Sequence, residues 1–353
     1  MDDTVAPELA SHEQAAVPGA APRRRRRRWP WVLAALLVLL LALPVTYVAS
    51  FAVNATGGVD RSIRSTGHDA YWLGHAWVDG RKVQADVDAL AAQLEGSGIR
   101  DLYIHAGPYA DDGTLDPALR PKATWLLEAL HTAAPEVRVQ AWLGNVLADD
   151  RMRLTSGVTQ TKVLEGVDDI LAEGWDGVHY DFEPALNNDQ PFLDLLKATH
   201  AKTQAAEAQF SVATPKLHPV QWFRLPVDWL PMQALWSQDY LRQVSEHVDQ
   251  VAIMSYDTFL PSEKAYQGYI RRQTELALDA VPADVDLLIG APAYHDQKIY
   301  RWDSAETMAA NIAGVQQGLE GVPRDRPIGV SLYVDFDATD QDWASYRDDW
   351  AQQ

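Results

Sequence analysis

The residues most able to do chemistry in this chain of 353 residues lie in one short segment, Trp175–Pro184, with the sequence WDGVHYDFEP. Its composition predicts a buried β-strand. Because successive strand side chains point to opposite faces, His179, Asp181 and Glu183 share one face. The other face carries apolar residues, Val178, Tyr180 and Phe182. At roughly 3.3 Å of rise per residue, the Cα atoms of the two acidic residues lie about 6 to 7 Å apart.

Two carboxylates at this spacing are suited to acid catalysis. Like charges so close together raise the pKa of at least one of them, and a carboxyl group that stays protonated near neutral pH can serve as a general acid. The alternative is an edge strand with a solvated acidic face. The apolar opposite face and Pro184, directly after Glu183, favour a covered strand that ends at a functional rim.

Short apolar runs alternate with longer amphipathic runs along the rest of the chain, which is typical of βα units and a parallel sheet. The expected strands are Ala70–Trp77, Asp101–His105, Val137–Leu143, Gly177–Glu183, Phe210–Ala213, Gln250–Tyr256, Asp286–Ala291 and Ile328–Tyr333. The expected helices are 83–94, 118–133, 161–173, 191–206, 239–247, 266–280, 307–320 and 340–350. Eight units in about 285 residues predict an α/β fold, a (β/α)8 TIM barrel, with no second domain.

Reactive groups of such a barrel gather at the carboxyl ends of its strands. The expected ends are rich in polar and aromatic residues: Tyr71, His75, Trp77, His105, Trp142, Asn145, Asp181, Glu183, Lys216, His218, Tyr256, Asp257, Tyr294, His295, Asp296, Tyr333, Asp335 and Asp337. Aromatic rings stack on the C–H faces of sugars, and carboxylates bind their hydroxyls. The set therefore predicts a sugar site. Trp222 and Trp229, in the insertion after the fifth strand, are further candidates for sugar contacts.

The amino-terminal region predicts a membrane anchor. Residues 1–28 form a disordered basic tail that ends in six arginines, and residues 29–53 are almost uninterruptedly apolar, which is long enough to span a bilayer. The positive-inside rule places the tail in the cytoplasm. Residues 54–68 would be a stalk, and residues 69–353 an extracytoplasmic barrel on a single-pass protein of the cell membrane. A cleavable signal peptide is the alternative, because Val53-Asn54-Ala55 resembles a cleavage site.

Charge narrows the class of partner. The chain carries 30 Lys and Arg against 49 Asp and Glu, a net charge of −19, and without a tail of about +2 the remainder is near −21. This disfavours nucleic acid and acidic lipid surfaces. The chain has no cysteine, so disulfides and thiolate metal sites are excluded. Abundant alanine, with far more arginine than lysine, indicates a bacterial genome of high GC content. No cofactor is expected, and the oligomeric state is left open.

The segment Asp176–Glu183 resembles the fourth-strand signature D-G-x-D-x-D-x-E of the family 18 glycoside hydrolases, the chitinase-like group, at seven of its eight positions. Ala252–Asp257 is similar to the sixth-strand M-x-Y-D segment of that family, and Ile289–Tyr294 to its seventh-strand G-x-P-x-Y segment. The third-strand Ser-x-Gly-Gly pattern is absent, and the usual tryptophan at the end of the last strand is missing near Tyr333. The resemblance is that of a distant member.

The resemblance implies a hydrolase that cleaves a β-linked, N-acetylated glycan, either chitin-like or derived from peptidoglycan. Glu183 would be the general acid, and Asp181 would polarise the 2-acetamido group that attacks the anomeric carbon in a substrate-assisted, retaining mechanism. Tyr256 would bind the same group. Asp257 would contact sugar hydroxyls or steady Tyr256. The expected substrate-binding residues are Asp257, His179, Tyr71, Trp77, Trp142, Tyr294, Tyr333 and Asp335.

His179 departs from the family pattern, which has an aspartate there. A histidine in this position could pair with Asp181, keep it ionised and lower its pKa. That would alter the pH optimum or mark a lost activity.

Three alternative functions remain open at this stage. One is a retaining glycosidase with a carboxylate nucleophile, either Asp181 or Asp257. Another is a lectin-like barrel that binds glycans without hydrolysing them, although such relatives usually lack the terminal glutamate. The weakest is a metal-dependent hydrolase built on His75, His105, Asp181 and His295, because no HxH or HExxH spacing supports it.

Overall fold

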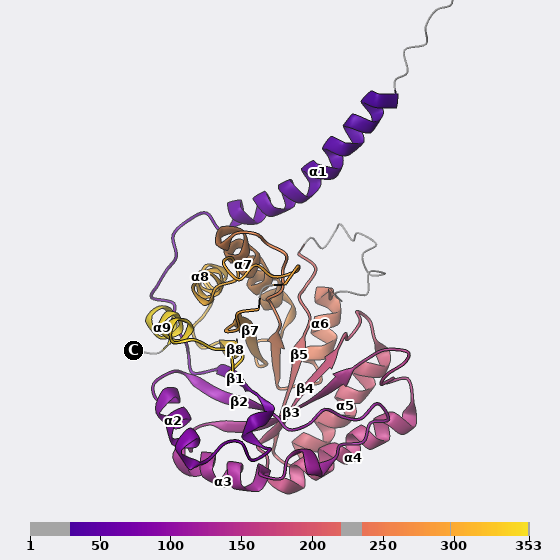
Figure 1. Ribbon diagram of the computed structural model, residues 1–353, viewed down its shortest axis with the longest axis vertical. Coiled ribbons are helices and arrows are strands. Elements are labelled where there is room, and N and C mark those ends of the chain that lie inside the picture. Colours follow the sequence, from indigo (N-terminus) through magenta and orange to yellow (C-terminus); the bar gives the residue numbers. More distant parts are fainter. Residues whose placement is uncertain (1–28, 220–234, 297, 352–353) are drawn as a thin grey trace, which may run out of the picture. The chain divides into compact units, whose positions relative to one another are not determined.

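The computed structural model describes residues 29–219, 235–296 and 298–351, and in this part of the chain eight parallel strands close into a barrel (Figure 1). The strands are β1 (Asp69–Leu73), β2 (Ile99–His105), β3 (Arg138–Val146), β4 (Gly177–Glu183), β5 (Gln209–Thr214), β6 (Gln250–Ile253), β7 (Asp286–Pro292) and β8 (Ile328–Tyr333). Each strand pairs with the next, and β8 pairs with β1. The predicted (β/α)8 barrel is confirmed.

Helices follow the strands around the outside of the barrel (Figure 1). They are α2 (Gln84–Leu94), α3 (Ala123–Ala133), α4 (Gly157–Glu173), α5 (Gln190–Ala205), α6 (Gln238–Ser245), α7 (Glu263–Ala280), α8 (Met308–Gly318) and α9 (Asp340–Asp349). Two short 3-10 turns, His75–Trp77 and Pro117–Leu119, precede α2 and α3.

The sequence sets where most of these helices begin. The residue before each of α4 to α9 is a serine, threonine or aspartate whose side chain accepts a hydrogen bond from the backbone N–H three positions further on: Ser156, Asp189, Ser237, Ser262, Thr307 and Thr339. Such a cap satisfies an N–H group that has no partner inside the helix, and each contributes about 1 kcal/mol.

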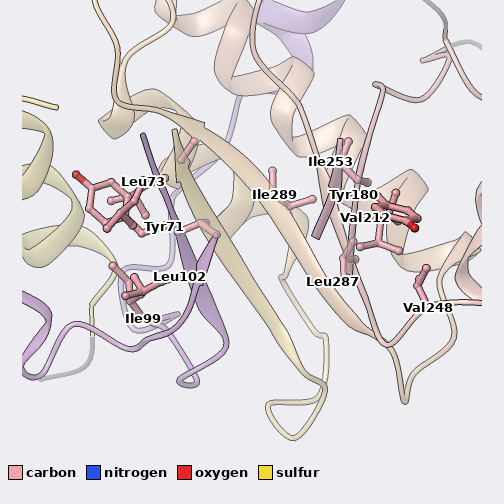
Figure 2. Close-up of a cluster of buried hydrophobic side chains, with 14 of the residues drawn as sticks. Tyr71, Leu73, Ile99, Leu102, Tyr180, Val212, Val248, Ile253, Leu287 and Ile289 are labelled. Carbon is pink, nitrogen blue, oxygen red and sulfur yellow. The ribbon is translucent and has the colours of Figure 1, made fainter. Parts of the chain in front are cut away.

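Alternation along the strands creates two separate packing layers. Side chains such as Tyr71, Leu73, Leu102 and Tyr180 point outward into the large hydrophobic cluster between strands and helices, part of which is shown in Figure 2. Side chains at intervening positions point into the barrel and form a second, smaller cluster, which includes Ala70, Trp72, Tyr103, Trp142 and Tyr256. The outward layer holds the fold together, and the inward layer carries the site.

Polar groups fill the amino-terminal half of the barrel interior. Asp101 on β2 accepts hydrogen bonds from Arg138 through both carboxylate oxygens, at 2.8 and 2.7 Å, and from Gln140 and Gln250, both at 2.9 Å. The Tyr103 hydroxyl donates to Gln250 Oε1 at 2.6 Å. Buried polar groups are tolerated when they are hydrogen-bonded in this way, so this network belongs to the structural core.

The amino-terminal helix α1 (Trp29–Asn54) is continuous, and its last turns, from Thr46 onward, belong to the same compact unit as the barrel. In that unit Phe51 packs edge-on against Tyr269 of α7, and Asn54 Nδ2 donates to the Gly268 carbonyl at 2.7 Å. Among the described residues, no helix combines the length and apolar character that crossing a membrane requires. The anchor at 29–53 stays a prediction. The tail at 1–28 and both Trp222 and Trp229 lie outside the described residues.

Candidate active site

Strand β4 carries its acidic residues to the carboxyl end of the barrel interior. Val178, Tyr180 and Phe182 are buried in the outward layer, so His179, Asp181 and Glu183 point inward, as the alternation predicts. Gly144 on β3 pairs with Asp181, and a Cβ atom at Gly144 would lie only 1.8 Å from the Asp181 carbonyl oxygen. Glycine at this point therefore allows β4 to approach β3 closely.

A cavity of about 260 Å³ opens beside the two acids. The residues that line it are Asp181, Glu183, Met254, Tyr256, Asp257, Tyr294, Asp296, Lys298, Tyr333, Val334, Phe336 and Asp337. They come from the ends of β4, β6, β7 and β8 and from the loops that follow. The structure thus brings together the predicted residues Glu183, Asp181, Tyr256, Asp257, Tyr294 and Tyr333.

Asp181 has few hydrogen-bond partners for a carboxylate inside a barrel. Trp142 Nε1 donates to its Oδ2 at 2.9 Å, while its buried Oδ1 has no partner. Burial and the neighbouring Glu183 charge raise the pKa of Asp181 to about 7, and the Trp142 bond opposes this only in part. Asp181 can therefore hold a proton near neutral pH, and the hydrogen-bonding capacity of its Oδ1 is not used within the protein.

Glu183 is exposed at the mouth of the barrel, with its side chain in the wall of the cavity. Desolvation by the surrounding walls raises its pKa. The Lys216 charge opposes this rise, and the Asp257 charge adds to it. A solvent-accessible carboxyl group with a raised pKa has the properties of a proton donor.

Three tyrosines form an aromatic wall of the cavity. Tyr256 stacks on Tyr333, with ring centroids 5.4 Å apart and planes 20° apart, and Tyr294 packs edge-on against both rings. Burial raises the pKa of the Tyr256 hydroxyl well above its ordinary value, so this group is a neutral hydrogen-bond donor. Such a wall offers flat apolar faces with hydroxyl groups at their edges, which suits a sugar ring.

Asp257 follows β6 in a left-handed backbone conformation, with φ of +56°. The Tyr294 hydroxyl donates to its Oδ1 at 2.6 Å. Glu306 is buried and accepts from the Asp257 and Thr258 backbone N–H groups at 2.6 and 2.7 Å. Asp257 therefore steadies Tyr294, and its predicted contact with sugar hydroxyls or with Tyr256 stays a prediction.

The structure contradicts the pairing of His179 with Asp181. His179 is fully buried one layer below the cavity and stacks on Tyr103 at 3.7 Å. Its Nε2 accepts a hydrogen bond from Trp72 Nε1 at 3.2 Å. Its Nδ1 therefore carries the hydrogen and donates it to Ser211 Oγ at 2.7 Å. Burial lowers the pKa of His179 well below its usual value, so the ring is neutral and does not lower the pKa of Asp181.

Four more of the predicted substrate-binding residues lie away from the cavity lining. Tyr71 points outward and packs edge-on against Trp343 of α9, at 5.3 Å between centroids. Trp77 Nε1 donates to Asp335 Oδ2 at 2.7 Å, and the other oxygen of Asp335 accepts from the Gly74 N–H at 2.7 Å. The Trp77–Asp335 pair joins the loops after β1 and β8. Trp142 reaches the site through Asp181.

The sequence places Lys216 among the polar residues at the expected strand ends but gives it no role in catalysis or substrate binding. It is buried, and its Nζ donates to the Tyr256 and Asp257 carbonyls at 2.7 and 3.1 Å. Lysine residues are mostly exposed in proteins, so the presence of a lysine at this position does not predict a buried side chain. Its position at a strand end was the one available indication.

The residues proposed for a metal centre do not assemble. His75 and His105 lie together, with 3.2 Å between their Nδ1 atoms, but His295 binds Asp342 on α9 at 2.7 Å. Within residues 29–219, 235–296 and 298–351, no group of three or more metal-ligating side chains is close enough to hold an ion.

Comparison with known proteins gives a similarity in fold. No protein-family model matches the chain, and no curated protein matches it in sequence. Among solved structures, the spore cortex-lytic enzyme SleL of Bacillus megaterium QM B1551 is 13% identical, with a TM-score of 0.56 over 82% of this chain and 75% of that one. A chitinase of Chromobacterium violaceum ATCC 12472 is 15% identical, with a TM-score of 0.53 over 79% of this chain and 98% of that one.

A class V chitinase of Pseudomonas fluorescens Pf-5 gives a similar result, at 13% identity and a TM-score of 0.55 over 79% of this chain and 98% of the other. The chain thus has the barrel fold of chitinases and cortex-lytic enzymes. The resemblance that the strand motifs indicated extends to the fold of most of the chain. At these identities the similarity defines the fold alone, and the chemistry must be argued from the site.

Proposed function

We propose that this protein is a glycoside hydrolase of the family 18 kind, acting on a β-linked, N-acetylated glycan. The observation that carries the proposal is the joint placement of Asp181 and Glu183 on the wall of one cavity, which the stacked Tyr256 and Tyr333 also line. Both carboxyls have raised pKa values, so the site can hold a proton at neutral pH. The cavity has room for about one sugar ring.

The proposed reaction uses these groups in sequence. Glu183 gives its proton to the glycosidic oxygen as the bond from that oxygen to the anomeric carbon breaks. The acetamido carbonyl oxygen of the same sugar forms the new bond to that carbon. A water molecule then attacks the same carbon while Glu183 accepts its proton, and the bond from the carbon to the acetamido oxygen breaks. Two successive displacements retain the anomeric configuration.

Asp181 is suited to the acetamido group. Its Oδ1 lacks a partner in the protein, so it can accept the N–H hydrogen of the substrate amide. A developing positive charge on that amide would favour the ionised form of Asp181 and lower its pKa once substrate is bound. Tyr256 can donate its hydroxyl hydrogen to the acetamido oxygen.

The kind of glycan is inferred from the same features and from the proteins of similar fold. The structural neighbours include chitinases and a spore cortex-lytic enzyme. We infer that the substrate is chitin-like or derived from peptidoglycan. The acidic net charge of −19 also favours a neutral or cationic glycan over a strongly anionic one.

Matched oligosaccharides with and without N-acetyl groups test the proposal. The full-length chain is incubated with both series, and the products are analysed by mass spectrometry. We expect cleavage of the acetylated series alone, because the mechanism needs the acetamido oxygen. Cleavage of both series would indicate a carboxylate nucleophile in place of the acetamide. Binding of either series without any cleavage would indicate a lectin-like protein.

We also propose that residues 29–53 anchor the chain in the cell membrane with the barrel on the extracytoplasmic side. The six arginines at 23–28 and the apolar run that follows support this orientation. Fractionation of cells that express the full-length chain, with protease added from outside, is the test. The barrel should sediment with membranes and be digested in intact spheroplasts. Recovery of a shortened chain in the medium would indicate cleavage at the Val53-Asn54-Ala55 site instead.

A further inference from the structure

The segment after β6 presents two of the residues of the site, and buried charges hold its peptide groups from both sides. Lys216 donates from Nζ to the carbonyl oxygens of Tyr256 and Asp257, at 2.7 and 3.1 Å. Glu306 accepts from the N–H groups of Asp257 and Thr258 at 2.6 and 2.7 Å. The left-handed conformation of Asp257 is therefore fixed on its carbonyl side by a cation and on its amide side by an anion.

Lys216 is itself held in place. The residue after it, Leu217, exchanges two hydrogen bonds with Gln273 of α7: its N–H donates to Oε1 at 2.7 Å and its carbonyl accepts from Nε2 at 2.8 Å. The Lys216 carbonyl accepts from the Trp236 N–H at 3.0 Å. The fixed backbone and the burial of the side chain together restrict where the Lys216 ammonium group can lie. Substrate binding therefore costs little additional side-chain entropy at this residue.

A buried lysine needs compensating charge to remain protonated. Three acids provide it. Burial lowers the pKa of Lys216, and the charges of Asp257, Glu306 and Glu183 oppose this. The interaction acts in both directions, because the Lys216 charge lowers the pKa of Glu183 against the desolvation that raises it.

We propose that Lys216 is a positioning residue of the active site: it fixes the peptide groups that orient Tyr256 and Asp257, and it supplies a buried positive charge that acts on Glu183. The second part rests on the proposed function, in which Glu183 is the proton donor. The titratable and charged groups around Glu183 are Asp181, Lys216, Tyr256, Asp257, Tyr333 and, at the rim of the cavity, Asp296, Lys298 and Asp337.

Two neutral variants separate the two roles. Lys216→Met removes the charge and the hydrogen bonds, whereas Lys216→Gln removes the charge but keeps an N–H donor. In both, the alkaline limb of the pH profile of kcat should move upward by about one pH unit, because Glu183 loses an opposite charge that favours its ionised form. The kcat at the optimum should fall about tenfold in Lys216→Met and less in Lys216→Gln.

Thr258→Val is the matched control. Thr258 Oγ1 donates to Glu306 at 2.8 Å in the same segment, so this variant loosens the segment without changing any charge. We expect a decrease in kcat of about twofold to threefold and an unchanged alkaline limb. If folded Lys216 variants behaved in the same way as Thr258→Val, Lys216 would have a structural role alone, and the proposal would be wrong.

A titration of the wild-type, full-length chain tests the charge interaction without turnover and without a Lys216 variant. In protein labelled with ¹³C at lysine Cε, the Lys216 signal should show an inflection at the pH where Glu183 titrates, and the inflection should be lost in Glu183→Gln. Absence of the inflection in the wild type would overturn the proposal. If the protein showed the inflection but hydrolysed no glycan, the interaction between Lys216 and Glu183 would be supported and the proposed function would be wrong.

Discussion

Asp101 near the amino end of the barrel and Asp181 near its carboxyl end both point into the barrel interior, yet their surroundings differ. Asp101 is fully buried and receives four hydrogen bonds, two from Arg138, one from Gln140 and one from Gln250. Asp181 receives one, from Trp142, and its Oδ1 has no partner. Asp101 thus has its hydrogen-bonding capacity satisfied, whereas Asp181, which lines the cavity, has one oxygen atom without a hydrogen-bond donor.

This contrast teaches how one fold uses the same residue type for two purposes. A carboxylate surrounded by donors has its hydrogen-bonding capacity satisfied by the protein and stabilises the core. A carboxylate with few donors and an acidic neighbour retains a proton and can bind a ligand group that the protein does not satisfy. The position of functional residues at the carboxyl ends of barrel strands follows the general rule for this fold.

The largest effect should come from Asp181→Asn. The change removes the proposed acceptor for the substrate amide and should decrease kcat about 10³-fold, within the range of a lost group that acts in the transition state. Folding should be intact, because only one hydrogen bond is altered. Steady-state kinetics on an N-acetylated oligosaccharide, together with circular dichroism, would measure both. Activity within tenfold of the wild type would contradict the proposed role of Asp181.

Asp101→Asn should show the opposite behaviour. It removes the closer acidic partner of Arg138 and leaves Asp286, at 3.6 Å, as the other one. The free energy of unfolding should decrease by about 3 kcal/mol, since breaking a buried pair is strongly destabilising. The kcat of the folded fraction should stay near that of the wild type. Urea unfolding and activity below the transition would measure the two quantities. If Asp101→Asn lost activity but not stability, Asp101 would have a catalytic role, and the contrast between a structural Asp101 and a functional Asp181 would be wrong.

The pH dependence of stability should differ between the wild type and Asp181→Asn. The pKa of Asp181 is about 7 in the folded protein and 3.8 for an ordinary aspartate, so the folded state binds more protons between these values. Its contribution to stability is therefore complete below about pH 4 and is lost as the pH rises through about 7. The wild type should lose roughly 2 to 4 kcal/mol more than Asp181→Asn between pH 4 and pH 8. Equal pH dependence in urea unfolding would show that Asp181 is ionised.

Trp142→Phe should have the smallest effect. It removes the N–H group that stabilises the Asp181 anion, so the titration of Asp181 should move upward by about 0.7 pH unit, the equivalent of one hydrogen bond of about 1 kcal/mol. Carboxyl ¹³C spectra of aspartate-labelled protein would follow this titration, with Asp181→Asn used to assign the signal. A shift toward lower pH would mean that Trp142 acts on Asp181 in another way.

The sequence predicted the barrel well because hydrophobic alternation and turn signals are local. The bounds of β4 and β8 agree with the prediction at both ends. Residues on strands with clear alternation were also placed correctly, since the two faces of β4 differ in polarity. Tyr71 was misplaced because β1 is apolar at four consecutive positions, Ala70–Leu73, so its pattern does not reveal which side chains point inward.

Other parts of the site depend on contacts between distant segments. His179 was expected beside Asp181 because both share a face, but its ring nitrogens bind Trp72 and Ser211 on other strands. The ties of Lys216 and Glu306 to the segment after β6 also join residues 40 or more positions apart. Such partners follow from how the closed barrel arranges strand ends, which the local pattern does not encode.

The most direct test of the central claim, that Glu183 supplies the proton for glycosidic cleavage, is a comparison of the wild type and Glu183→Gln on one N-acetylated oligosaccharide. Reducing ends and thermal unfolding would be measured on the same preparations of full-length chain. We predict that the wild type releases shorter oligosaccharides and that Glu183→Gln is slower by at least about 10³-fold, with an unchanged unfolding temperature. Equal rates of hydrolysis in the two proteins would contradict the account.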